Sequence, residues 1–143
     1  MDQTVLVSMS NAAATLTTED IERGEKLLAA LDSDNKRFKA RRPVNGAFWQ
    51  LQPERDKWVL CLAMPNIRRD GPRLAYRHIL GAIRRHHIAG MLLTDISLVD
   101  KDDPSYTRLS RTIQAPGINR LKLIGNWVMG ERLPDIFAYR ITK

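Results

Sequence analysis

The sequence lacks the features that define several classes of protein. It has a single cysteine, Cys61, which excludes an internal disulfide and any zinc or iron–sulfur site built from several cysteines. No apolar run approaches the ~18 residues that a membrane-spanning helix needs. The first residues, Met1 to Met9, carry no basic segment of the kind that begins a secretory signal. We therefore expect a cytoplasmic protein with no membrane partner.

Motifs of catalysis and cofactor binding are absent as well. The glycines occur singly, in neither a dinucleotide-binding nor a P-loop pattern, and there is no G-x-S-x-G segment. Cys61 lies in an apolar segment, which favours a buried side chain over a nucleophile. His78, His86 and His87 lack the spacing of a zinc site. The sequence thus predicts no catalytic residue, no metal and no cofactor, and we expect the protein not to be an enzyme.

The overall composition is typical of one globular domain. Of 143 residues, 43% are hydrophobic and 27% are charged, and a chain of this length buries enough surface to fold alone. Residues 10–16 are small and show no periodicity. We predict an N-terminal lead-in over residues 1–16, whose flexibility the sequence leaves open, and a single α+β domain over residues 17–143.

Hydrophobic periodicity and capping residues predict about three helices and five strands. The helices begin at Thr17, after Asp70-Gly71-Pro72, and at Asp103-Pro104, and the first should end at residues 32–35. The strands lie at residues 47–52, 57–64, within 91–99, 120–124 and 135–141. The first two should form an antiparallel hairpin, and the second is apolar on both faces, as in the middle of a sheet. The order α-β-β-α-β-α-β-β predicts an α+β domain, with helices packed on a mixed or antiparallel five-stranded sheet.

Positive charge is concentrated in the middle of the chain. The formal charge is +7, yet residues 1–34 hold two basic against seven acidic residues, while residues 35–90 hold 13 against three. An excess of this size can steer an anionic partner to the surface. Alternatively, the acidic first helix packs beside the basic middle and cancels part of its charge.

The basic residues of this middle region are the candidate binding site. They lie in a connector after the first helix, just before the second helix, and along one face of the second helix. The candidate anion-binding residues are Arg41, Arg42, Arg68, Arg69, Arg73, Arg77, Arg84 and His87. Arginine suits phosphate because of its planar fork of donors. Trp49, Trp58 and Trp127 offer stacking surfaces, unless Trp49 and Trp58 belong to the core.

These residues predict a binding or adaptor domain with an anionic partner, nucleic acid being slightly favoured over an acidic protein surface. One alternative is a small metal-dependent nuclease or other hydrolase that uses Asp95 with a nearby arginine or histidine. Another is a homo-oligomeric structural component held together by the apolar hairpin of residues 47–64.

Five segments of the sequence also carry a resemblance. They are Ala47-Phe48-Trp49, Trp58-Val59-Leu60, Gly71-Pro72-Arg73-Leu74-Ala75-Tyr76-Arg77, Asp95-Ile96-Ser97-Leu98-Val99 and Ala138-Tyr139-Arg140-Ile141. Over residues 36–142 the chain resembles a group of small bacterial proteins of uncharacterised function. The resemblance implies a common fold and a bacterial origin, and no activity. Within these segments we expect Tyr76 and Tyr139 to be packing anchors and Asp95 to pair with Arg77 or Arg140.

Overall fold

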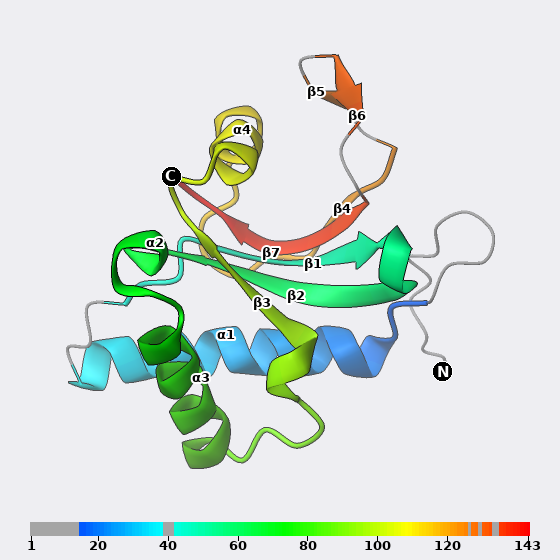
Figure 1. Ribbon diagram of the computed structural model, residues 1–143. Helices are drawn as coiled ribbons and strands as arrows, with labels where there is room; N and C mark the ends of the chain where they lie inside the picture. The colour runs from blue at the N-terminus through cyan, green and yellow to red at the C-terminus, as the bar shows by residue number, and fades with distance from the viewer. Residues whose placement is uncertain (1–14, 39–41, 126, 129, 133–134) are drawn as a thin grey trace.

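The computed structural model describes the whole chain except residues 1–14, 39–41, 126, 129, 133 and 134. Its described residues form an α+β domain with a five-stranded mixed sheet, as predicted, and with four helices where the sequence predicted about three (Figure 1). The helices are α1 (Thr18–Phe38), α2 (Ile67–Asp70), α3 (Arg73–Arg85) and α4 (Pro104–Thr112). The strands of this sheet are β1 (Gly46–Gln52), β2 (Lys57–Met64), β3 (Ile96–Asp100), β4 (Leu121–Leu123) and β7 (Ile136–Ile141).

The sheet has the order β3-β2-β1-β7-β4. The β1–β2 hairpin is antiparallel, as expected, and turns through the short helix η1 (Pro53–Arg55). β3 follows a second short helix, η2 (Leu93–Asp95), and pairs with β2 in parallel, while β7 pairs antiparallel with both β1 and β4. β2 therefore lies inside the sheet, which explains why both of its faces are apolar.

Each face of the sheet carries its own core. Figure 1 shows α1 and α3 below the sheet and α4 above it. Trp58, Leu60 and Leu62 of β2 pack toward α1 and α3, whereas Cys61 and Ala63 pack toward α4. This alternation follows from the two-residue period of a strand. The predicted hairpin is thus buried inside the chain, so it offers no exposed apolar face of the kind that the oligomer hypothesis invoked.

Local capping signals set two of the four helix starts. Thr17 Oγ1 accepts a hydrogen bond from the Asp20 amide and the Asp20 carboxylate accepts one from the Thr17 amide, which is a capping box at the start of α1. Asp103 caps α4 by accepting from the Ser105 amide, as predicted. Leu16, in the predicted lead-in, is fully buried in the core on the α1 side of the sheet.

Two helix boundaries and one connection differ from the prediction. α1 does not end at residues 32–35 but continues to Phe38, because Asp34 is bonded to α3 side chains rather than to the end of its own helix. Asp70 does not cap α3; it ends α2, a single turn that periodicity cannot detect. A small antiparallel pair, β5 (Trp127–Val128) and β6 (Glu131–Arg132), stands in the predicted connection before β7.

The pairing of β7 with β1 has a register shift at Tyr139. Ala47 pairs with Arg140 while the next residue, Phe48, pairs with Ala138, so Tyr139 is an extra residue in the ladder. Tyr139 is fully buried, and its hydroxyl accepts from Trp49 Nε1 at 2.9 Å and donates to the Ile21 carbonyl. The expectation that Tyr139 is a packing anchor is therefore confirmed. Tyr76 is one as well, since it packs on the core and donates to the Ile96 carbonyl at 3.1 Å.

Candidate anion-binding surface

Three arginines form an exposed row along α3. Arg73, Arg77 and Arg84 are all exposed, while Ala75, Ile79 and Ala82 on the opposite side of the helix are buried. None of the three arginines makes an ion pair or a side-chain hydrogen bond with a residue that the structure describes. Their charge is therefore directed to solvent, and the predicted helical stripe is confirmed for these three.

The remaining predicted residues have different surroundings. Arg41 lies outside the described residues. His87 is exposed, but it comes after His86, the C-cap residue of α3, and its φ of 53° is not helical. The helical periodicity of α3 therefore does not align His87 with the three arginines. The Arg68 guanidinium lies 3.6 Å from Asp103 and that of Arg69 lies 3.0 Å from Asp70. Arg68 and Arg69 thus contribute less net positive charge than the sequence indicated.

A buried carboxylate beneath the surface was missed in the sequence. Asp34 is 2% exposed, and its two oxygens accept hydrogen bonds from Arg85 at 2.6 and 3.2 Å and from His86 at 2.9 Å. Burial alone would raise the pKa of Asp34, but the bonds and charges of His86 and Arg85 outweigh it and hold the pKa below its ordinary value. A signal was present, since Asp34 falls seven residues after Leu27 and so on the apolar face of α1.

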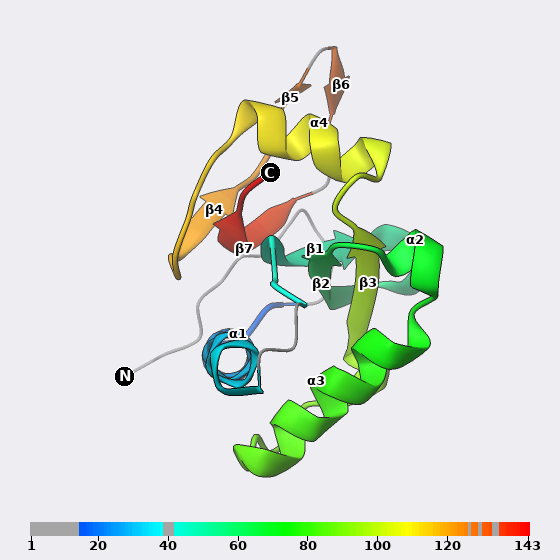
Figure 2. The same ribbon diagram turned by 90° about the vertical axis from the view of Figure 1, so that its left-hand side faces the viewer.

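The acidic first helix cancels little of the basic middle. Asp34 neutralises Arg85, but Glu25 pairs with Arg120 and Asp32 with Arg140, both in the last third of the chain. α1 and α3 lie side by side below the sheet (Figure 2), but none of the three exposed arginines of α3 forms an ion pair with a described residue of α1. The positive potential of this helix face is therefore retained.

A groove lies between the end of α1 and α3, next to the arginine row. We call it the α1–α3 groove; its volume is about 300 Å³, and it is lined by Phe38, Arg42, Leu74, Arg77, His78, Gly81 and Arg85. The guanidinium of Arg85 lies 4.9 Å and that of Arg37 lies 5.1 Å from the centroid of the Phe38 ring. The backbone carbonyl of Arg42 accepts from the Asn35 side chain at 2.7 Å, which ties the connector to α1.

His78 adds an unsatisfied polar atom to the lining of this groove. Its Nε2 is buried and has no hydrogen-bond partner among the described residues. Burial is the main cause that lowers the pKa of His78; the charge of Asp34 opposes this shift, and the charges of Arg85 and Arg42 add to it.

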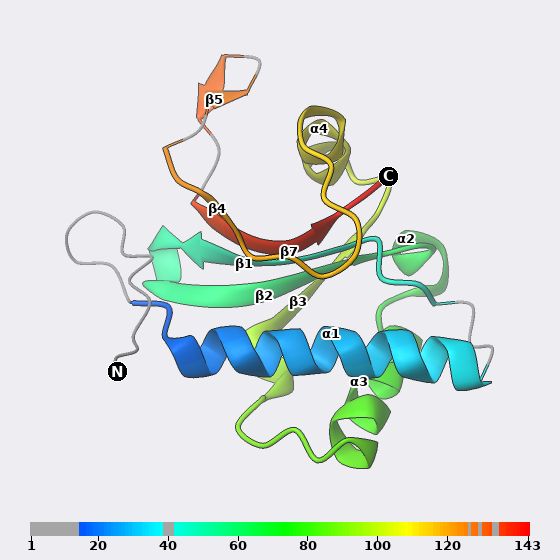
Figure 3. The ribbon, with the colours of Figure 1, turned by 180° about the vertical axis from the view of Figure 1, so that it is seen from behind.

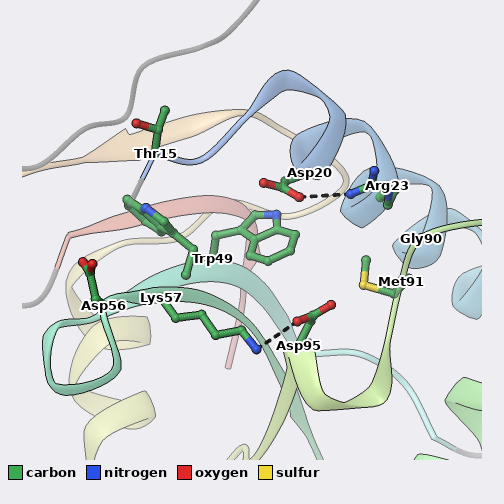
Figure 4. A pocket seen from close by; sticks show the side chains of 10 residues that line it. Thr15, Asp20, Arg23, Trp49, Asp56, Lys57, Gly90, Met91 and Asp95 are labelled. Atoms are coloured by element: carbon green, nitrogen blue, oxygen red, sulfur yellow. Dashed lines mark hydrogen bonds and ion pairs between the residues drawn. The ribbon is translucent and has the colours of Figure 1, made fainter. Parts of the chain in front are cut away.

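A second cavity, at the other end of α1, contains Asp95 (Figure 4). It has a volume of about 230 Å³, and we call it the Asp95 cleft. Figure 4 shows the Lys57–Asp95 ion pair on one side and the Asp20–Arg23 ion pair on the other, each with an N–O distance of 3.0 Å. The expectation that Asp95 pairs with Arg77 or Arg140 is wrong, because the parallel β2–β3 register places Asp95 beside the start of β2.

The Asp95 cleft does not favour the hydrolase alternative. No histidine lines it, and its lysine and arginine already bind aspartates. Over the described part of the chain, no group of three His, Cys, Asp or Glu side chains could hold a metal ion. Cys61 is no better placed as a nucleophile, because it is buried and its pKa is raised by burial to about 12.

Two of the three tryptophans are unavailable for stacking on a ligand. Trp49 is 3% and Trp58 is 5% exposed, and both belong to the core below the sheet. Their rings are not directly opposed across the hairpin, since Trp49 pairs with Leu60 and Trp58 with Leu51. The side chain of Trp127 lies outside what the structure describes.

The chain was compared with known proteins by family, by sequence and by structure. No protein-family model, curated protein or solved structure matches it. No helix among the described residues is long and apolar enough to span a bilayer. The resemblance to a group of small bacterial proteins stays a prediction, and the arginine row with the α1–α3 groove is the arrangement on which a function is argued.

Proposed function

We propose that this protein is a non-enzymatic binding domain that docks nucleic acid on its basic surface. We define the basic surface as Arg73, Arg77 and Arg84 of α3 together with Arg42 at the α1–α3 groove. The observation that carries the proposal is the row of three exposed arginines without an internal partner. Several other arginines are used within the fold, as Arg23, Arg120 and Arg140 show by their ion pairs.

The spacing of the row favours nucleic acid over an acidic protein. Arg73 and Arg77 are separated by about 6 Å along the helix axis, and Arg77 and Arg84 by about 10 Å. A row of bidentate donors on a straight helix suits a backbone that repeats its phosphates at regular intervals. Carboxylates on a protein surface have no such repeat. The proposed contact is with phosphates, so sequence preference is not expected from these residues.

Fluorescence anisotropy with labelled single-stranded and duplex DNA and RNA tests the proposal. Binding should be detectable at 50 mM salt and weaken steeply toward 200 mM, because each phosphate contact releases counterions. The variant R73Q/R77Q/R84Q should bind at least tenfold more weakly at 50 mM salt. Loss of three phosphate contacts should also make the negative slope of the log association constant against log salt concentration shallower by about 2–3.

The matched control removes three exposed charges outside the basic surface. The variant R111Q/K122Q/K143Q has the same net charge as R73Q/R77Q/R84Q, and all three of its substituted positions are exposed. It should bind nearly as well as the wild type, apart from the weak effect of total charge. Equal losses in both triple variants would show that binding is non-localised, and absence of binding to every nucleic acid at 50 mM salt would refute the proposal.

A further inference from the structure

The α1–α3 groove differs from the rest of the basic surface because one of its arginines is held in place. Nε and Nη2 of Arg85 both donate to Asp34, and the guanidinium stacks on the Phe38 ring. Gly81 leaves room for this position, since a Cβ there would lie 3.1 Å from Arg85 Nη1. Nη1 makes no hydrogen bond with the described residues, so Arg85 offers a preorganised donor that costs little ordering on binding.

Two further arginines add positive charge to the same groove. Arg42 and Arg77 both line it, and neither forms an ion pair with a described residue, whereas Arg85 is balanced by Asp34. A phosphodiester carries one negative charge, but a phosphate monoester carries about −1.5 to −2 at pH 7 and has three acceptor oxygens. The monoester therefore matches the charge and the number of donors better.

The other walls of the groove complete this match. Phe38 and Leu74 are 50% and 44% exposed and form an apolar wall beside the arginines. An apolar wall next to a cationic cluster fits the organic part of an ester, which free inorganic phosphate lacks.

We infer that the α1–α3 groove is a binding site for a phosphate monoester, held by Arg42, Arg77 and Arg85. The ester has two sources, the 5′-terminal phosphate of a nucleic acid strand and a free nucleoside monophosphate. Binding of a 5′-terminal phosphate rests on the proposed function, because the groove would then hold the end of a nucleic acid strand that lies along the arginine row.

The test compares two oligonucleotides that differ only at the 5′ end. A 3′-labelled single strand carrying a 5′-phosphate should bind about tenfold more tightly than the same strand with a 5′-hydroxyl, at 100 mM salt. R77Q should remove this preference. R73Q, one helical turn away and outside the groove lining, should weaken both strands alike and leave the ratio unchanged. Circular dichroism of both variants checks that the fold is retained.

Adenosine 5′-monophosphate, titrated by calorimetry against wild type and R77Q, separates the two sources. If the phosphorylated strand is preferred and R77Q abolishes the preference, the groove holds a strand terminus. If only the monophosphate binds, and does so through Arg77, the groove proposal stands and the nucleic-acid function fails. If both strands bind equally and the monophosphate does not bind, the groove proposal fails and the nucleic-acid function stands. If nothing binds, both fail.

Discussion

Asp34 shows how one side chain joins distant parts of the chain. It belongs to α1, yet it accepts hydrogen bonds from Arg85 and His86 at the end of α3. A carboxylate buried in this way is tolerated only because it is paired and hydrogen-bonded. The same contact positions Arg85 at the α1–α3 groove, so stability and the proposed binding site depend on one residue.

We predict that D34N lowers the free energy of unfolding by about 1–3 kcal/mol at pH 7. The pKa of Asp34 is lowered in the folded state, so its ionised form stabilises the fold above the ordinary carboxyl pKa, and that stabilisation is lost as pH falls through the lowered value. The difference between wild type and D34N should therefore shrink below about pH 4. Urea unfolding at pH 7 and pH 3 measures it.

The control for this prediction is D102N. Asp102 is largely exposed, and among the described residues it forms an ion pair only with the neighbouring Lys101. Its substitution should change stability by less than about 0.5 kcal/mol. If D34N lowered the free energy of unfolding by the same amount at pH 7 and at pH 3, the charge of Asp34 would not be what stabilises this contact.

At the scale of elements, the packing of α1 on the sheet depends on a glycine inside the helix. A Cβ on Gly24 would overlap the Tyr139 ring, coming within 2.8 Å of Cε2, and would lie 3.0 Å from Trp49 Nε1. Tyr139 cannot move aside easily, because it is fully buried and its hydroxyl bonds both Trp49 and Ile21. The glycine is therefore a requirement of close approach between helix and strand.

We predict that G24A destabilises the protein by about 1–3 kcal/mol, as overpacking does. Helix propensity alone gives the opposite sign, because alanine is about 1 kcal/mol better than glycine inside a helix. Thermal or urea unfolding distinguishes the two. S33A, at an exposed position of the same helix, serves as the control and should be nearly neutral. A G24A variant more stable than the wild type would contradict this packing.

At the scale of the whole molecule, the α1–α3 groove and the Asp95 cleft lie at opposite ends of α1. This helix runs along the sheet (Figure 3). In the Asp95 cleft, Asp20 binds Arg23 and Asp95 binds Lys57. At the α1–α3 groove only Arg85 is paired, and Arg77 has no partner among the described residues. This contrast in internal pairing is the reason for placing the anion-binding function at the α3 end.

Strand pairing and burial predict that stability against local unfolding differs between the strands of the sheet. β1, β2 and β7 have strand partners on both sides, and their residues are mostly buried. β4 has three residues, a single partner and no buried residue. We expect hydrogen exchange, followed by mass spectrometry or NMR, to be slowest in β1, β2 and β7 and fast in β4. Equal protection of β4 and β1 would contradict the assignment of the core.

Residues close in sequence made several features predictable. The hairpin strand at residues 57–64 and the Asp103 cap of α4 were identified because alternation and capping act over a few residues. The partner of Asp95, the continuation of α1 past Asp34 and the role of Arg85 were missed. Each depends on a contact between segments that are tens of residues apart.

The sequence by itself determined the class of fold, the two-faced burial of β2 and the arginine row on α3, because strand and helix periods decide which side chains share a face. Only the tertiary structure decided which charges are neutralised. Asp34 reaches Arg85, and Asp32 and Glu25 reach Arg140 and Arg120, because packing brings these elements together. A net charge counts ionised groups, whereas a binding surface consists of those whose charge the fold leaves uncompensated.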